Sequence, residues 1–181
     1  MKRFLAFLCC LLIAVVSFAQ NSNNHLKYMG IPITGTIAQF QTKLASKGAQ
    51  LNKLLSSNIP AGSRAFNGNF AGNKVLIFVF YDTQTKIVYR VKSVIEGVSE
   101  EIAEQKYANM RQLFTQKYNY IQYGEQEKKE SLSIDAGNGR IDMYITKDED
   151  YSRYPYYYNV HIDYLDGNNS DKHDNNLLDE I

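Results

Sequence analysis

The sequence NFAGNKVLIFVFYDTQTKIVYRVKSVIE, residues 69–96, decides the class of fold. Two runs rich in Val, Ile, Phe and Tyr, at 74–81 and 86–95, flank the polar turn Asp82-Thr83-Gln84-Thr85. Such residues favour a pleated and half-buried surface. A second turn, Ala71-Gly72-Asn73, precedes the first run. The stretch therefore predicts two long strands that form a hairpin and follow a third strand.

One helix is expected before this stretch, at 36–47, and one after it, at about 99–118. Thr36 and Gln39 fit a capping box at the start of the first helix, and Ser99 is a suitable N-cap for the second. Apolar residues recur at helical spacing along both segments. This pattern predicts amphipathic helices that pack against a sheet.

Further strands are expected in both halves of the chain. Alternating apolar residues and turn signals place them at 49–56, 64–70, 120–123, 130–136, 140–147 and 156–165. The segment 166–181 is rich in Asp and Asn and has few apolar residues to bury. We therefore expect it to be a flexible acidic and Asn-rich tail.

One helix followed by four strands occurs twice in this order of elements, at about 26–97 and 98–165. The best local match joins Ala71-Gly72-Asn73 to Ala136-Gly137-Asn138, because a basic residue (Lys74 directly, Arg140 after one glycine) and an alternating strand follow each triplet. The alternative is that any two hairpins of an α+β protein look alike. The sequence predicts a single α+β domain at 20–165, a tandem repeat of helix plus four-stranded antiparallel sheet, with helices packed on one sheet face.

The first residues have the pattern of a secretory signal peptide. Lys2 and Arg3 precede an apolar run at 4–16, and Ser17-Phe18-Ala19 supplies small residues before a cleavage site at Gln20. The run is shorter than the roughly 20 residues that span a bilayer, so no transmembrane segment is expected in the mature chain. These features predict a periplasmic or secreted protein.

Removal of residues 1–19 would leave about 160 residues, enough for one domain with a sizeable core. Both cysteines, Cys9 and Cys10, lie inside the apolar run. Lipoprotein anchoring is therefore the less favoured alternative, and the mature chain would have no disulfide. The formal net charge of +1 becomes −1 without Lys2 and Arg3, which excludes a basic footprint for nucleic acid.

Strand alternation sorts the side chains into a core face and an outer face. The outer face carries apolar residues beside charged ones, and such a surface suits a protein or peptide partner. Alternation places Val88 on the outer face and Tyr89 in the core. An alternative is that the N-terminal segment or a neighbouring subunit covers the apolar part. The candidate binding residues are Leu76, Phe78, Phe80, Arg90, Lys92, Tyr144, Tyr157 and His161.

No catalytic or cofactor motif stands out in the sequence. It has no G-x-S-x-G turn, and its glycines do not form a phosphate loop. His25 is assigned to the leader and His173 to the tail. His161 and Asp163 share one strand face and could bind a divalent cation, but a solvent-facing salt bridge is the favoured interpretation. We therefore expect no catalytic residue, no metal and no cofactor.

The segment YMGIPITGTIAQFQTKLASKG, residues 28–48, resembles the start of a family of small secreted proteins of gut-type Gram-negative bacteria. The predicted tandem pattern is similar to the β-lactamase-inhibitor-protein-like fold. The resemblance implies a non-enzymatic periplasmic protein with an unknown partner, and it supplies no site residues. The absence of Cys from the mature chain is a departure from the disulfide-containing members of that fold.

Taken together, these features predict an exported, non-catalytic binding protein that recognises a protein or peptide through an open sheet face. The alternatives are an envelope-acting hydrolase and a structural or assembly accessory of the cell envelope.

Overall fold

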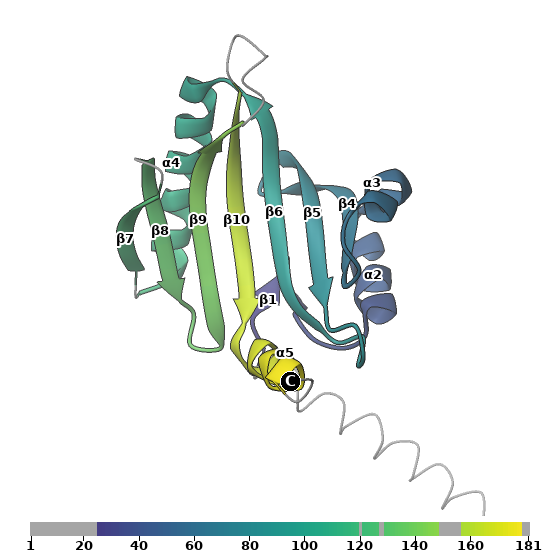
Figure 1. Cartoon of the computed structure of the whole chain (residues 1–181). Helices are drawn as coiled ribbons and strands as arrows, with labels where there is room; N and C mark the ends of the chain where they lie inside the picture. Colours follow the sequence, from purple (N-terminus) through teal and green to yellow (C-terminus); the bar gives the residue numbers. More distant parts are fainter. Residues whose placement is uncertain (1–24, 120, 127–128, 149–156, 179–181) are drawn as a thin grey trace, which may run out of the picture.

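The two long strands predicted from the opening stretch lie near the centre of a large sheet (Figure 1). They are β5 (Asn73–Tyr81) and β6 (Val88–Val98), and they pair antiparallel. The computed structural model describes residues 25–119, 121–126, 129–148 and 157–178. The predicted signal peptide lies outside these described residues.

Within the described residues the sheet has eight strands in the order β3-β4-β5-β6-β10-β9-β8-β7, and its neighbouring strands are antiparallel. The pairing of β6 with β10 (Tyr158–Asp166) joins the two halves of the sheet. The other strands are β3 (Gln50–Leu51), β4 (Ser63–Phe70), β7 (Ile121–Gln126), β8 (Lys129–Asp135) and β9 (Gly139–Lys147).

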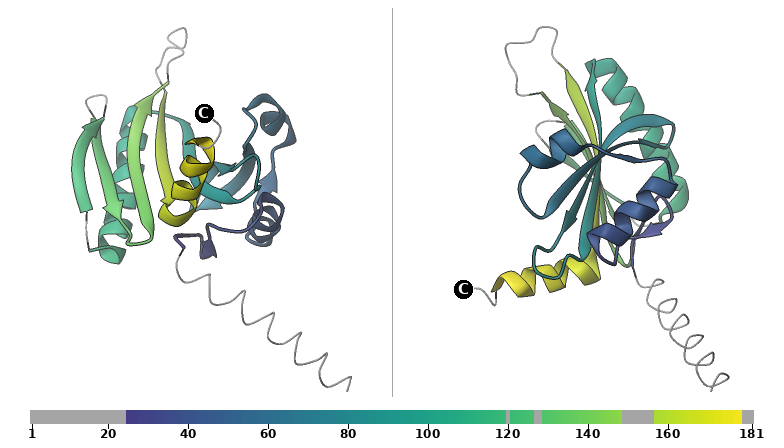
Figure 2. Two further views of the ribbon diagram at one scale, coloured as in Figure 1. Left: turned by 60° about the horizontal axis from the view of Figure 1, so that its bottom comes forward. Right: turned by 90° about the vertical axis from the view of Figure 1, so that its right-hand side faces the viewer.

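One face of the sheet is covered by two helices and a short hairpin, as the edge-on view in Figure 2 shows for the helices. These elements are α2 (Ile37–Ser46), α4 (Glu100–Lys117) and the hairpin of β1 (Lys27–Tyr28) and β2 (Ile31–Pro32). Two further helices lie toward the other side of the sheet, at its margins: α3 (Lys53–Asn58) and α5 (Gly167–Leu178). The predicted α+β class is confirmed.

The predicted caps form at both long helices. Thr36 and Gln39 make a complete capping box at α2, and the Ser99 hydroxyl accepts a hydrogen bond from the Ile102 amide at α4. Each cap satisfies an amide that the first helical turn leaves without a partner. Local sequence thus determines where these two helices begin.

The core lies between the sheet and this helical layer. Strand alternation directs Ile77, Met143 and Ile162 into it, and all three are fully buried. Tyr28 of the hairpin stacks on Phe70 with ring centroids 5.4 Å apart. The described part of the N-terminal segment, from residue 25 onward, therefore packs on the core face of the sheet.

The predicted strand at 49–56 is wrong beyond its first residues. Only Gln50 and Leu51 pair with β4, and the chain then turns into α3. The Asn52 side chain accepts a hydrogen bond from the Leu55 amide at 3.0 Å. This N-cap starts a helix within a segment whose apolar residues alone suggested a strand.

The expected flexible tail is also wrong for Gly167–Leu178, which forms α5. The Asp166 carboxylate accepts a hydrogen bond from the Asn169 amide at 3.0 Å, in the manner of an N-cap. The Asn169 side chain donates to the carbonyl oxygens of Ile33 and Val88 at 2.9 and 3.0 Å. Polar contacts hold this helix, so a search for apolar residues could not reveal it.

A register shift in β6 overturns the predicted positions of Val88 and Tyr89. Tyr81 pairs with Val88, whereas Phe80 pairs with Arg90, so Tyr89 is an extra residue in the strand. Val88 is consequently fully buried, and Tyr89 is only partly covered. Alternation beyond this bulge follows the prediction.

Candidate functional site

The sheet face opposite α2 and α4 gathers most of the predicted binding residues, and we call it the open face (Figure 1). Among the described residues, α3 and α5 flank this face without crossing its centre. Side chains on it are mostly half-buried by one another. It comprises Leu76, Phe78, Phe80, Arg90, Lys92, Val94, Tyr144, His161 and Asp163.

Strand register places the apolar residues of β5 directly opposite the cations of β6. Phe78 faces Lys92, and Phe80 faces Arg90. The Arg90 guanidinium lies 4.9 Å from the centre of the Phe80 ring, a cation–π arrangement. Cross-strand pairs of this kind stabilise a sheet and build one continuous surface.

Arg90 also makes a two-point ion pair with Asp163 of β10. Its Nε donates to Asp163 Oδ1 at 2.8 Å, and its Nη2 donates to Asp163 Oδ2. These hydrogen bonds raise the pKa of Arg90 above its usual range, so the guanidinium stays charged. The sequence analysis placed Asp163 on this face but did not include it in the site. Its partner Arg90 is 73 residues away in the chain.

A stacked pair of rings continues the surface across β9 and β10. Tyr144 and His161 are cross-strand partners, and their ring centroids are 4.7 Å apart. The Lys92 ammonium lies 5.5 Å from the centre of the Tyr144 ring. Lys92 has no carboxylate partner within the part of the chain that the structure describes, so its positive charge is uncompensated at the centre of the face.

His161 is held in its neutral form. Its Nε2 lies 2.7 Å from the Thr146 hydroxyl, and its buried Nδ1 has no hydrogen-bond partner among the residues that the structure describes. Burial, together with the nearby Lys92 charge, lowers the pKa of His161 to about 4. The favoured interpretation of His161 as part of a solvent-facing salt bridge is therefore wrong, because Asp163 pairs with Arg90 instead.

This pKa shift predicts a loss of stability in acid. Between pH 6.5 and about 4 the unfolded chain protonates His161 while the folded chain does not, so stability falls as the pH falls through that window. The loss should approach about 3 kcal/mol at the acid end. Urea unfolding of the wild type and of His161→Gln across this pH range should show a shallower pH dependence in the variant. Parallel curves would contradict the neutral, buried imidazole.

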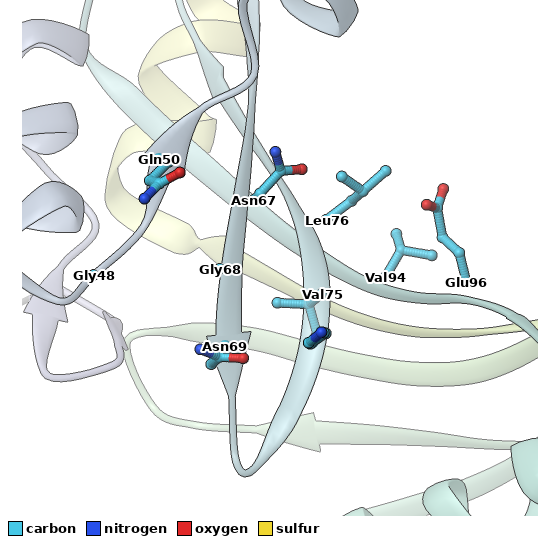
Figure 3. A pocket seen from close by; sticks show the side chains of 10 residues that line it. Gly48, Gln50, Asn67, Gly68, Asn69, Val75, Leu76, Val94 and Glu96 are labelled. Carbon is cyan, nitrogen blue, oxygen red and sulfur yellow. The ribbon is translucent and has the colours of Figure 1, made fainter.

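A hollow of about 480 Å³ extends the open face at the Leu76 end of the sheet (Figure 3). Leu76 and Val94 are cross-strand partners, and both line it together with Asn67 and Glu96. The hollow is wide and shallow, which suits a protruding side chain of a partner better than an enclosed small molecule. Neither Val94 nor Glu96 was among the predicted site residues.

Tyr157 is the predicted binding residue that the structure does not join to the others. It precedes β10, is 36 % exposed, and has a backbone carbonyl that accepts a hydrogen bond from the Asp148 amide. Seven of the eight predicted residues thus share the open face, because they all lie within paired strands where alternation is regular.

Two histidines that the sequence analysis set aside have structural partners. His25 contacts Asp166, and His173 contacts Asp82. Within the described ranges, no group of three or more His, Cys, Asp or Glu side chains is arranged to hold a metal ion. A search of the described helices for one long and apolar enough to cross a membrane also found none.

Comparisons of the chain with models of known families, with curated proteins and with solved structures found no match.

Proposed function

We propose that this chain is an exported, non-catalytic binding protein that recognises a protein or peptide through its open face. The observation that carries the proposal is the mixture of side chains on that face. Half-buried Leu76, Phe78 and Phe80 lie beside Arg90 and Lys92, and no described helix lies across them. Aromatic residues and Arg are enriched at the cores of protein interfaces.

The chemistry of the face favours a partner with both apolar and acidic groups. Half-buried Phe78 and Phe80 offer apolar contact, and the Lys92 ammonium, which has no carboxylate partner among the described residues, offers an ion pair. The stems of Lys and Arg can themselves pack against apolar groups. An acidic side chain of a partner placed over Lys92 would therefore form an ion pair with the Lys92 ammonium.

Export rests on the pattern of residues 1–19, with the mature chain entering the periplasm or the medium after cleavage. A protein of this kind would meet its partner in the cell envelope or outside the cell. The resemblance of the predicted tandem pattern to the β-lactamase-inhibitor-protein-like fold is part of this proposal.

We also propose that the fold arose as a tandem repeat of helix plus four strands. The sheet order supports this, because β3 to β6 and β7 to β10 each run consecutively and meet at the β6–β10 pair. In both halves the matched triplets, at 71–73 and 136–138, lie at the turn between the second and third strands. A duplication would explain why the sheet consists of two similar halves of four consecutive strands each.

The double variant Phe78→Ser/Phe80→Ser tests the binding proposal. Loss of two aromatic anchors should weaken partner binding by about 30-fold or more while the protein stays folded. The measurement is capture from envelope extract, followed by affinity determination with each purified partner and thermal unfolding of each variant.

Leu54→Ser is the matched control, because Leu54 is 77 % exposed on α3 and lies outside the open face. It should leave capture and stability unchanged. If the double variant unfolds, the open face is part of the core and the proposal fails. Equal capture by the double variant and the wild type would also overturn it.

A further inference from the structure

A second concave site lies at the end of the sheet where α5 packs. It is a cavity of about 330 Å³, more enclosed than the hollow on the open face, and we call it the α5 pocket. It brings together three segments that are far apart in the chain: the N-terminal segment, the β5–β6 turn and α5. Its lining residues are His25, Thr34, Asp82, Thr85, Ile87, Asn169, Lys172, His173 and Asn176.

His173 is fixed in this pocket by two contacts. Its Nδ1 lies 2.9 Å from Asp82 Oδ2, and its ring stacks on Tyr89 with centroids 4.2 Å apart. Tyr89 is the extra residue of the β6 bulge, so the bulge supplies the stacking surface. The imidazole is thereby oriented by both a carboxylate and an aromatic ring.

Asp82 is itself saturated with hydrogen bonds. Its Oδ1 accepts from the amides of Gln84 and Thr85 and from the Thr85 hydroxyl, at 3.1, 2.7 and 2.8 Å. Burial alone would raise the pKa of Asp82, but these bonds and the contacts with His173 and Asn176 lower it below its usual range. Asp82 is therefore an ionised carboxylate that fixed hydrogen-bond donors stabilise.

His25 is oriented in the same way from the opposite end of the chain. Its Nδ1 lies 3.0 Å from Asp166 Oδ1, and Asp166 is fully buried. Asp166 also accepts hydrogen bonds from the amides of Leu26 and Asn169, at 2.8 and 3.0 Å. Two imidazoles lining one cavity are thus each held at Nδ1 by a buried carboxylate.

The arrangement leaves three nitrogen atoms as the free groups of the pocket: Nε2 of each imidazole and the Lys172 ammonium. Because each Nδ1 carries the hydrogen that it donates to a carboxylate, Nε2 is the nitrogen that remains for a ligand, and it is a donor when the ring is protonated. Lys172 adds an ammonium that has no acidic partner among the described residues. The amide protons of Asn169 are used on the Ile33 and Val88 carbonyls, and Asp82 has both oxygens engaged.

From this geometry we infer that the α5 pocket binds a small anion through its oxygen atoms, a carboxylate or a phosphate group. With both rings protonated, His25 and His173 donate to the anion from Nε2 while each Nδ1 donates to its carboxylate, and Lys172 supplies the third positive group. Charge-assisted hydrogen bonds to oxyanions are the strong contacts that such donors make. The volume is sufficient for a small metabolite-sized ligand. This site is separate from the open face and does not depend on the proposed binding function.

An NMR titration of the full chain tests the inference. The three histidines of the chain give separate imidazole signals, and His161 on the open face is an internal reference. Inorganic phosphate and succinate are added in separate series at constant ionic strength and at about pH 6, below the usual pKa of histidine, so that protonated rings can donate from Nε2. A saturable shift of the His25 and His173 signals at about 1 mM or below, with His161 unchanged, is the expected result.

Lys172→Ala should weaken this binding about tenfold or more, because it removes one charged donor from an exposed position on α5. Lys53→Ala, an equally exposed change on α3, should leave the affinity unchanged. A response to only one of the two anions still supports the site and identifies the ligand class.

The proposal is overturned if neither anion gives a saturable shift, if His161 moves in parallel, or if both lysine variants bind like the wild type. A parallel titration with Zn²⁺ provides a further outcome. Saturable Zn²⁺ binding at His25 and His173 without an anion response would replace the anion assignment with a metal site.

Discussion

Replacing Asp166 with Ala is expected to lower the free energy of unfolding by about 3–5 kcal/mol. Asp166 is fully buried and accepts hydrogen bonds from His25 and from the amides of Leu26 and Asn169. The substitution leaves buried donors without acceptors, and each such donor costs about 1–3 kcal/mol. It also removes the cap of α5 and the contact that fastens the N-terminal segment to the end of β10.

The matched control is Asp171→Ala, which removes an exposed carboxylate from the same helix. Its effect should stay within about 0.5 kcal/mol. Urea unfolding monitored by circular dichroism gives both free energies, with the slope of the transition compared between variants. A loss below about 1 kcal/mol for Asp166→Ala would show that the carboxylate does not join these elements.

Gly139→Ala is expected to destabilise the fold by about 3–5 kcal/mol or to prevent folding. Gly139 has φ +151°, and a Cβ there would lie 2.1 Å from the Leu165 carbonyl oxygen and 2.9 Å from the Gly167 nitrogen. These are backbone atoms at the end of β10 and the start of α5, so no side-chain rotation can relieve the clash. The strand pair β9–β10 would have to separate at this end.

Gly137→Ala in the same turn is the control that separates the cost of a steric clash from the cost of a positive φ. Gly137 also has a positive φ, +75°, but a Cβ there meets no atom within 4 Å. Its substitution should cost only about 1 kcal/mol, the strain of the left-handed conformation. Similar losses for both variants, measured by urea unfolding, would mean that close packing at Gly139 is not the cause.

The helices illustrate what local sequence predicts well. Thr36 with Gln39, and Ser99, mark the starts of α2 and α4 because a cap needs only residues three positions apart. The same locality explains the failure at α3. Asn52 is a cap in the structure, but the apolar residues that follow also fit a strand, and a six-residue helix carries too few turns to show a period.

The candidate site likewise has features that local sequence predicts and features that it does not. Alternation within β5 and β6 correctly assigned Phe78, Phe80, Arg90 and Lys92 to one face, and the error at Val88 came from a bulge that alternation does not signal. The ion pair of Arg90 with Asp163 depends on which strand lies beside β6. The order of strands follows from how the halves of the sheet meet, and no pattern within either strand specifies it.

The sequence by itself determined the α+β class, the two long capped helices, and the side of the sheet on which seven candidate binding residues lie. These properties follow from periods of two and 3.6 residues and from short capping motifs, all of which act over a few neighbouring positions. Only the tertiary structure decided that β6 meets β10, that α5 forms, and that His25 and His173 share one pocket. Those features depend on hydrogen bonds between residues up to 141 positions apart, such as His25 with Asp166, and such contacts leave no periodic pattern in the chain.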